Sequence, residues 1–203
     1  MGCNNVKEEI LLEHSKILKT MEDKEKLKKL FTSEENKVID FKLLFQARKD
    51  CPQNFHLKCN KKAPIVILVK VRETEEIFGI FLSIELESPT KYTEFKRTDK
   101  NCFLFSLTSM QKYQIKNKDN FLIQIFPEDD PNFISFGEDI ILNKKFLEKK
   151  LNSAILHKEN IKDGGDYDVN LAKTINNDQF TVEELEVIYV IFLLREKNEY
   201  YIE

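Results

Sequence analysis

FKLLFQARKDCPQNFHLKCNKKAPIVILVKVRETEEIFGIFLSI, residues 41–84, decides the fold of this chain. It contains two apolar runs, residues 65–71 and residues 77–84, with the polar sequence ETEE at residues 73–76 between them. The first run is rich in β-branched residues and almost continuously apolar, which is typical of a strand covered on both faces. A short polar break between two such runs predicts a hairpin, so we expect two antiparallel neighbouring strands.

Two short helices are expected before this hairpin. Leu43 to Lys49 is amphipathic and long enough for about two helical turns. Pro52 suits the first position of a second short helix, because proline lacks the N–H that this position leaves unpaired. We expect Phe55 and Leu57 on that second helix to be buried.

A longer helix is expected at residues 6–31. This stretch contains no Gly or Pro, and its apolar residues recur at spacings of three, four and seven. His14 and Lys24 interrupt the apolar stripe, which argues against a long coiled coil. Two alternatives remain: the helix packs onto the rest of the chain, which we favour, or it binds a partner.

Further apolar segments predict strands at residues 102–107, 112–116, 121–126, 134–142 and 185–194. Because side chains alternate along a strand, we expect Phe103 and Phe105 on one face and Leu104 on the other. Residues 85–100 are expected to form a charged loop, and residues 144–151 a short helix.

These elements predict an α+β fold: an antiparallel two-sheet β-sandwich with short flanking helices, preceded by an N-terminal helix. The length of 203 residues suits one domain plus an extension. The polar residues 32–36 have the composition of a linker. We therefore divide the chain into a helical extension, residues 1–36, and a globular domain, residues 37–203.

Charge and cysteine usage restrict the class of protein. The 32 basic and 35 acidic residues nearly cancel, which does not favour nucleic acid as a partner. No apolar stretch approaches the roughly 20 residues that a membrane helix needs, and the amino terminus lacks the apolar run of a signal peptide. None of the four cysteines forms a CxxC pair. We expect a cytoplasmic protein with free thiols.

Several blocks of the sequence, in this order, resemble the TLDc domain. That family is found in oxidation-resistance proteins and in proteins that bind the vacuolar proton pump, and it shows LLY-ASRDG, F-H-KCD-KGPTL-LIKS, IFGGYTS, AFLFSLT, KY, FGGGHDL and FTVKEIEVF. The similar blocks here are LLFQARKD (43–50), FHLKC (55–59), AP (63–64), IFG (77–79), CFLFSLT (102–108), KY (112–113), FGEDI (136–140) and FTVEELEV (180–187). The resemblance covers roughly residues 37 to 194.

The departures from the family pattern mostly concern glycine. Cys51 replaces the glycine after Arg-Asp, and Ile80 replaces the second glycine after Ile-Phe. Only Gly137 remains of the glycine-rich turn before a late strand, and the tryptophan after the second strand is missing. Lost glycines change positions of positive φ or relax close backbone contacts, so the chain looks like a divergent member.

The resemblance implies a non-catalytic protein-interaction module. Its expected partners are subunits of the vacuolar proton pump, with a role in pump regulation or in protection from oxidative stress. A second hypothesis is a structural subunit of a larger assembly, held there by the N-terminal helix. A third is a redox or metal-dependent enzyme that uses Cys51, His56 and Cys59.

No catalytic, cofactor or metal site is predicted. Cys51, His56 and Cys59 lack a fourth ligand at a suitable spacing for structural zinc, so packing is the favoured interpretation. Asp163, Asp166 and Asp168, around two glycines, do not fit the calcium-loop spacing, and a solvated turn is expected there. The motifs of hydrolases, metalloproteases and phosphate-binding loops are not found.

Glu184 and Glu186 are the candidate interaction residues. Thr181 and Glu184 have the spacing of a capping box, which predicts one helical turn before the last strand. Glu186 alternates with Leu185 and Val187, so we expect it to face solvent. The resemblance to the family's closing block makes the two carboxylates worth testing as contacts for a protein partner.

Gly2 and Cys3 are candidate lipidation sites. Removal of Met1 would expose Gly2 for myristoylation and leave Cys3 for palmitoylation, although the usual pattern has Ser or Thr where this chain has Val6. The lysines of residues 6–31 alternate with glutamates, so charge cannot supply a second membrane signal. Membrane contact is therefore expected only through two acyl chains, because one myristoyl chain holds a protein only marginally.

Gly2→Ala should release the protein from membranes completely, whereas Cys3→Ser should leave weak, reversible binding. Fractionation of cells that express each variant, with mass spectrometry of the amino terminus, measures this. An unmodified amino terminus on a wild-type protein that stays in the soluble fraction would contradict the prediction.

Overall fold

The computed structural model describes residues 14–32, 36–50, 53–90, 93–115, 122–127, 129–137, 140–146, 154–156 and 179–194. Its elements are α1 (Met21–Phe31), β1 (Asn36–Gln46), α2 (Gln53–Cys59), β2 (Ile65–Val71), β3 (Ile77–Leu82), β4 (Phe95–Thr98), β5 (Phe103–Ser106), β6 (Gln111–Gln114), β7 (Leu122–Ile125), β8 (Asn132–Phe136), β9 (Ile140–Asn143), the 3₁₀ helix η2 (Lys144–Phe146), β10 (Ala154–Leu156), β11 (Gln179–Phe180) and β12 (Val182–Leu194).

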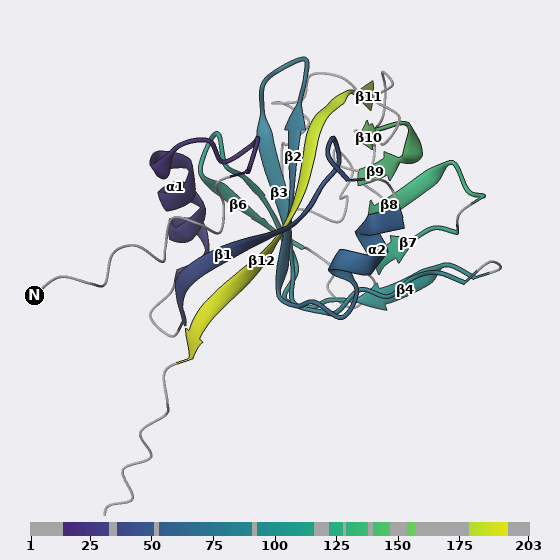
Figure 1. The fold of residues 1–203 in the computed structure, drawn as a ribbon, viewed down its shortest axis with the longest axis horizontal. Helices are drawn as coiled ribbons and strands as arrows, with labels where there is room; N and C mark the ends of the chain where they lie inside the picture. Colours follow the sequence, from purple (N-terminus) through teal and green to yellow (C-terminus); the bar gives the residue numbers. More distant parts are fainter. Residues whose placement is uncertain are drawn as a thin grey trace, which may run out of the picture.

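The strands form two antiparallel sheets that pack face to face (Figure 1). The first sheet has the order β1-β12-β2-β3-β5-β6, and the second has the order β11-β10-β9-β8-β7-β4. Buried side chains from both sheets form one apolar cluster between them, which we call the inner core. The predicted α+β fold with an antiparallel two-sheet β-sandwich is confirmed.

Helix α1 covers the face of the first sheet that points away from the second sheet (Figure 1). Phe31 on this helix lies 5.5 Å from the ring of Phe103 and 5.4 Å, edge to face, from the ring of Phe105. These rings belong to a second buried cluster, the outer core. Leu104 belongs to the inner core. The predicted alternation on this strand is confirmed, and both faces of the first sheet are covered.

Gly79 makes room for this packing. It pairs directly with Leu68 on β2 and with Phe105 on β5. A Cβ atom at Gly79 would lie 2.3 Å from Cζ of Phe105 and 2.9 Å from Cδ2 of Leu68. The ring of Phe105 therefore occupies the space that any other side chain would fill, and from there it meets Phe31.

The helix predicted at residues 43–49 is wrong, because this stretch belongs mostly to β1, paired with β12. The register shifts between Leu43 and Phe45, which marks a β-bulge. Leu43 packs against the outer core, while Leu44 and Phe45 both contact the inner core. The bulge breaks the period of two, so the sequence looked helical; tertiary pairing decided the conformation.

The helix predicted at residues 6–31 is too long. Helix α1 begins at Met21, after a capping box in which Thr20 and Asp23 bond each other's backbone N–H groups at 3.1 and 3.0 Å. Residues 14–20 are not helical, and residues 1–13 lie outside the described residues. The helix that does form packs onto the sheet, as favoured from the sequence, through Leu27, Leu30 and Phe31. The division at residues 36 and 37 stays a prediction.

Other boundaries also differ from the prediction. Residues 134–142 contribute to two strands rather than one, with Gly137 at φ 62° in the turn between them. The loop predicted at residues 85–100 contains the edge strand β4. The helix α2 is confirmed, and Phe55 is fully buried, but Leu57 is 82% exposed. Of the helix predicted at residues 144–151, the described part is η2.

Gly79→Ala should destabilise the fold by about 1–3 kcal/mol, because the new methyl group overlaps the buried ring of Phe105. The double variant Gly79→Ala with Phe105→Leu should show a smaller loss than the two single losses added together, since leucine lacks the atoms that clash. Urea denaturation of the four proteins measures this coupling. Strictly additive losses would mean that the clash is relieved elsewhere in the sheet.

Candidate functional site

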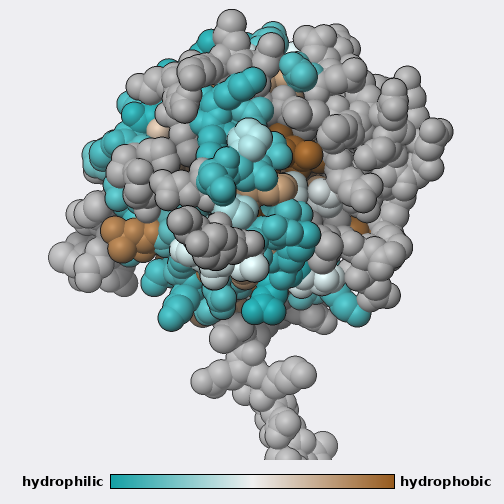
Figure 2. All heavy atoms as spheres, turned by 90° about the vertical axis from the view of Figure 1, so that its right-hand side faces the viewer, coloured by the Kyte–Doolittle hydropathy of each residue, from teal (hydrophilic) through white to brown (hydrophobic). Residues whose placement is uncertain are grey.

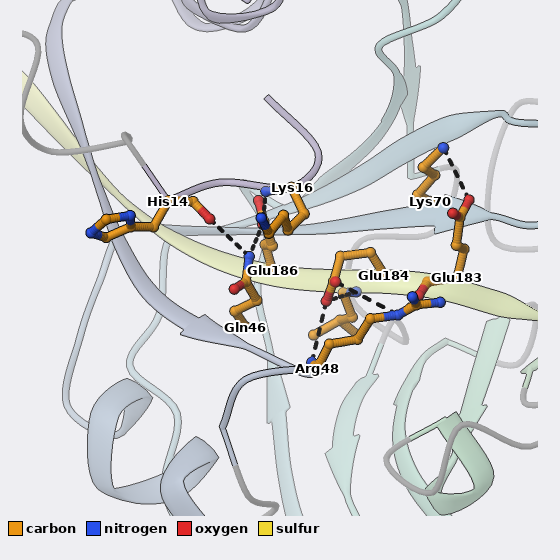
Figure 3. A network of polar contacts seen from close by, with 9 residues as sticks. His14, Lys16, Gln46, Arg48, Lys70, Glu183, Glu184 and Glu186 are labelled. Atoms are coloured by element: carbon orange, nitrogen blue, oxygen red, sulfur yellow. Dashed lines mark hydrogen bonds and ion pairs between the residues drawn. The ribbon is translucent and has the colours of Figure 1, made fainter. Parts of the chain in front are cut away.

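The start of β12 carries three glutamates, Glu183, Glu184 and Glu186 (Figure 3). We call these glutamates and their hydrogen-bond and ion-pair partners the acidic site. The register between β12 and β2 shifts between Val182 and Glu184. Glu184 and Glu186 are two residues apart on one strand, so they share a face of the first sheet. That face carries α1 and the outer core.

Glu186 is fully buried and bound by three neutral donors. Its carboxylate accepts hydrogen bonds from Ser15 Oγ at 2.5 Å, from the Lys16 backbone N–H at 2.6 Å and from Gln46 Nε2 at 2.6 Å. Gln46 lies opposite Glu186 on β1 and also donates to the His14 carbonyl oxygen at 3.1 Å. Hydrogen bonds to an ionised carboxylate are stronger than neutral ones, and here they replace water around a buried charge.

Glu184 has weaker partners, although it is also buried. It accepts hydrogen bonds from the backbone N–H groups of Leu185 at 3.2 Å and Arg48 at 3.4 Å, and Arg48 Nε lies 3.8 Å from its second oxygen. Burial raises the pKa of Glu184 above its ordinary value, and the negative charge of Glu186 raises this pKa further. Glu184 therefore holds its proton more tightly than a solvated carboxyl group does.

Glu183 forms the charged rim of the site. Its carboxylate lies 3.0 Å from Lys70 Nζ, and Lys70 also pairs with Glu75. The hydrogen bond from Lys70 lowers the pKa of Glu183 below its ordinary value. Arg48 Nε donates to the Glu183 carbonyl oxygen at 2.7 Å, which fixes the turn after β1 against β12.

A cavity of about 10 Å³ lies beside Glu184, lined by the two arginines Arg48 and Arg72 and by residues 182–185. That volume holds about one water molecule. Sites for small organic ligands are typically about 300–1,000 Å³. The cavity is therefore too small for a substrate, and Glu184 is best described as part of a packed polar network.

Two sequence predictions about this site are wrong. Thr181 to Glu184 does not form a helical turn, because the strand already begins at Val182. Glu186 does not face solvent, because the segment around Ser15 covers it. The alternation of β12 was predicted correctly, but the cover comes from residues about 170 positions away. No pattern within β12 could have indicated it.

The cysteine and histidine candidates lie in the packed part of the fold or outside the described residues. Cys59 is fully buried, with 0% of its surface accessible to solvent, and burial raises the pKa of its thiol to about 12. Cys102 is a buried free cysteine. His56 lies 3.3 Å from Asn60 through its Nδ1, and burial lowers the pKa of His56. Among the described residues, no cluster of three candidate metal ligands occurs.

Several candidates lie outside the described residues: Gly2, Cys3, Cys51, Asp163, Asp166 and Asp168. Their predicted roles stay predictions. In the described ranges, no helix has the length and apolar character needed to cross a membrane.

Comparison with protein families gives a clear result. The family model of the TLDc domain matches residues 11–191. The match spans most of the chain, so the chain belongs to the TLDc domain family. A search of curated proteins gave no match. The resemblance inferred from the sequence blocks is confirmed, and the match also includes the segment around Ser15.

Glu184→Gln and Glu186→Gln should have different effects on stability at neutral pH. Glutamine at 184 keeps an acceptor oxygen for Arg48 and Leu185 but removes a poorly solvated charge, so stability should hold or rise. Glutamine at 186 keeps one acceptor oxygen for three donors, so at least one hydrogen bond to a charged acceptor is lost, which should cost roughly 1.5–3 kcal/mol. Urea denaturation at pH 7 measures both.

The effect at Glu184 should depend on pH. Its folded-state pKa is raised, so ionisation penalises the folded state above that pKa, and the penalty disappears as pH falls through it. The advantage of Glu184→Gln over wild type should therefore be present at pH 7 and shrink toward pH 4. An advantage that grows on acidification would contradict the assigned direction.

Proposed function

We propose that this chain is a non-catalytic protein-interaction module of the TLDc family. The family match over residues 11–191 carries the proposal. The geometry of the acidic site supports it, since Glu186 is occupied by protein donors and the cavity beside Glu184 holds about one water. Recognition of another protein needs no open pocket, whereas conversion of a substrate does.

The proposed partners are subunits of the vacuolar proton pump. The resemblance of the sequence blocks to pump-binding and oxidation-resistance proteins supports this choice, as does membership of a family often linked to oxidative-stress resistance. In this proposal the protein acts in the cytoplasm and reaches the pump from that side. Contact with the membrane itself would come only through acyl chains on Gly2 and Cys3.

A structural subunit of a larger assembly is the second candidate. The sequence-based hypothesis makes the N-terminal helix the anchor in that assembly. Three apolar residues of α1, Leu27, Leu30 and Phe31, are buried against the chain's own first sheet, and Met21 at its start is exposed. An anchor in a larger assembly would therefore have to be another surface, which makes the regulatory module the favoured candidate.

A redox or metal-dependent enzyme that uses Cys51, His56 and Cys59 is the third candidate, and the geometry argues against Cys59 as its reactive thiol. A reactive thiol needs a lowered pKa and access to solvent, whereas Cys59 is buried with a raised pKa. Cys59 is therefore a poor nucleophile, which favours protection from oxidation through a protein partner over chemistry at this thiol.

Affinity purification of the tagged full-length chain, followed by mass spectrometry, tests the proposed function. We expect pump subunits in the eluate, and their amount should not change with Cys59→Ser or Cys102→Ser. The matched enzymatic arm measures peroxide consumption by the purified protein, which should equal that of a variant with Cys51, Cys59 and Cys102 all replaced by serine. A stable set of other proteins in fixed ratio would favour the structural subunit instead.

A further inference from the structure

Residues 14–18 form a segment that crosses the outer face of the first sheet without joining a strand ladder, and we call it the N-terminal segment (Figure 3). Two sheet side chains bind its backbone. Gln46 Nε2 donates to the carbonyl oxygen of His14 at 3.1 Å, and Glu186 accepts from the N–H of Lys16 at 2.6 Å. The Gln46 amide and the Glu186 carboxylate therefore bind one backbone carbonyl and one backbone N–H, two residues apart, on the same bent stretch of chain.

The side chains at both backbone-bound positions point away from this contact. His14 and Lys16 are exposed, and Figure 3 shows the imidazole of His14 directed away from Glu186. Ser15 lies between them and donates its hydroxyl to Glu186 at 2.5 Å, while its oxygen accepts from the Leu18 N–H at 2.8 Å. Recognition thus requires a hydroxyl at one position and tolerates any side chain on either side of it.

Ile17 and Leu18 of the N-terminal segment are 3% and 2% exposed and belong to the outer core, together with Leu68 and Ile188 of the sheet. We call Leu68 and Ile188 the aliphatic socket. Leu68 is the register partner of Glu186 on β2, and Ile188 is the next residue of β12 on the same face. The segment therefore follows a simple pattern: a hydroxyl residue, any residue, then two large aliphatic residues.

We propose that Gln46, Glu186 and the aliphatic socket form a peptide-docking groove. In this structure the chain's own N-terminal segment fills it, and a partner segment with a hydroxyl residue followed at the second and third positions by aliphatic residues fills it in exchange. This proposal rests on the proposed function as an interaction module and names the chemistry of the partner. It also gives the two buried residues, Gln46 and Glu186, a direct part in binding.

The energetics allow such an exchange. Among the described residues, the hydrogen-bond donors to Glu186 are three neutral groups and include no cation. When the segment leaves, water solvates the carboxylate and offsets part of what is lost. The internal segment is tethered beside the groove by the packed helix α1, which gives it the advantage of a high effective concentration. A partner therefore binds only when the internal segment is weakened or outcompeted.

The surface in Figure 2 shows no large apolar patch among the described residues that could bind a partner. The face in Figure 2, which includes the side of the molecule that carries α2, β7 and β8, is mostly hydrophilic where residues are described, with small separated apolar spots. The large apolar residues exposed among the described ones are Met21, Leu57 and Leu193, which lie on three different elements. Single exposed apolar residues are ordinary on protein surfaces.

Two full-length variants empty the groove by different routes and leave Gln46 and Glu186 unchanged. Ser15→Asp places a second carboxylate against Glu186, and the double variant Ile17→Ser with Leu18→Ser removes the aliphatic contacts. The probe is a fluorescein-labelled synthetic peptide of residues 12–20, LEHSKILKT, and the measurement is fluorescence anisotropy. Both variants should bind the peptide at least about tenfold more tightly than the wild type, whose groove is filled.

Matched peptides test the pattern. Replacement of the serine by alanine should weaken binding about tenfold or more, because it removes a hydrogen bond to a charged acceptor. Replacement of the histidine and the lysine before the isoleucine by alanine should leave binding unchanged. Equal binding of the serine and alanine peptides would overturn the proposed chemistry.

The remaining outcomes also decide the proposal. Folded variants that bind no peptide, or that bind it no better than the wild type, would overturn it. Loss of folding in both variants would show that the N-terminal segment is a fixed part of the core, which overturns it as well. The proposed function is tested separately, since capture of pump subunits by the wild-type chain does not require the labelled peptide to bind.

Discussion

Coverage of the first sheet on both faces is the constraint on which the rest of the structure depends. The second sheet covers one face, and α1 with the N-terminal segment covers the other. β12, in the interior of this sheet, therefore alternates between two buried environments: Leu185 and Val187 enter the inner core, and Ile188 and Val190 enter the outer core. A polar residue in the buried part of this strand, such as Glu186, has no access to solvent. Glu186 must therefore find its donors within the protein, and it finds two in the N-terminal segment and one in Gln46 on β1.

The same constraint explains the glycine of β3, and a separate constraint acts at the edge of the sheet. Gly79 is required because the ring of Phe105 must lie across β3 to meet Phe31 from the covering helix. At the edge of the sheet, β1 has two bulges, and carboxylates bind two of its backbone N–H groups: Asp40 binds that of Phe41, and Asp50 binds that of Gln46. Bulges and charges at an edge discourage pairing with a strand of another molecule.

The sequence predicted those parts of the fold in which the local pattern and the tertiary environment agree. The hairpin of β2 and β3 has continuous apolar runs and a polar turn, and both strands formed where expected. β1 was missed because its bulge places Leu44 and Phe45 together on the inner side, which destroys the alternation that identifies a strand. The acidic site was found only in part. The family resemblance drew attention to Glu184 and Glu186, but burial of Glu186 depends on residues far away in sequence.

Glu184 and Glu186 show how neighbouring residues of one type acquire different chemistry. Both are buried on the same face of one strand, yet Glu186 has three short hydrogen bonds and Glu184 has longer contacts with Arg48 and Leu185. Charge at Glu184 is costly, and its raised pKa reflects that cost. Charge at Glu186 is what the N-terminal segment binds. A carboxylate retained in the interior of a sheet, where an aliphatic residue would pack more simply, is best explained by the segment that it holds, and a contact that holds one segment by its backbone can hold another.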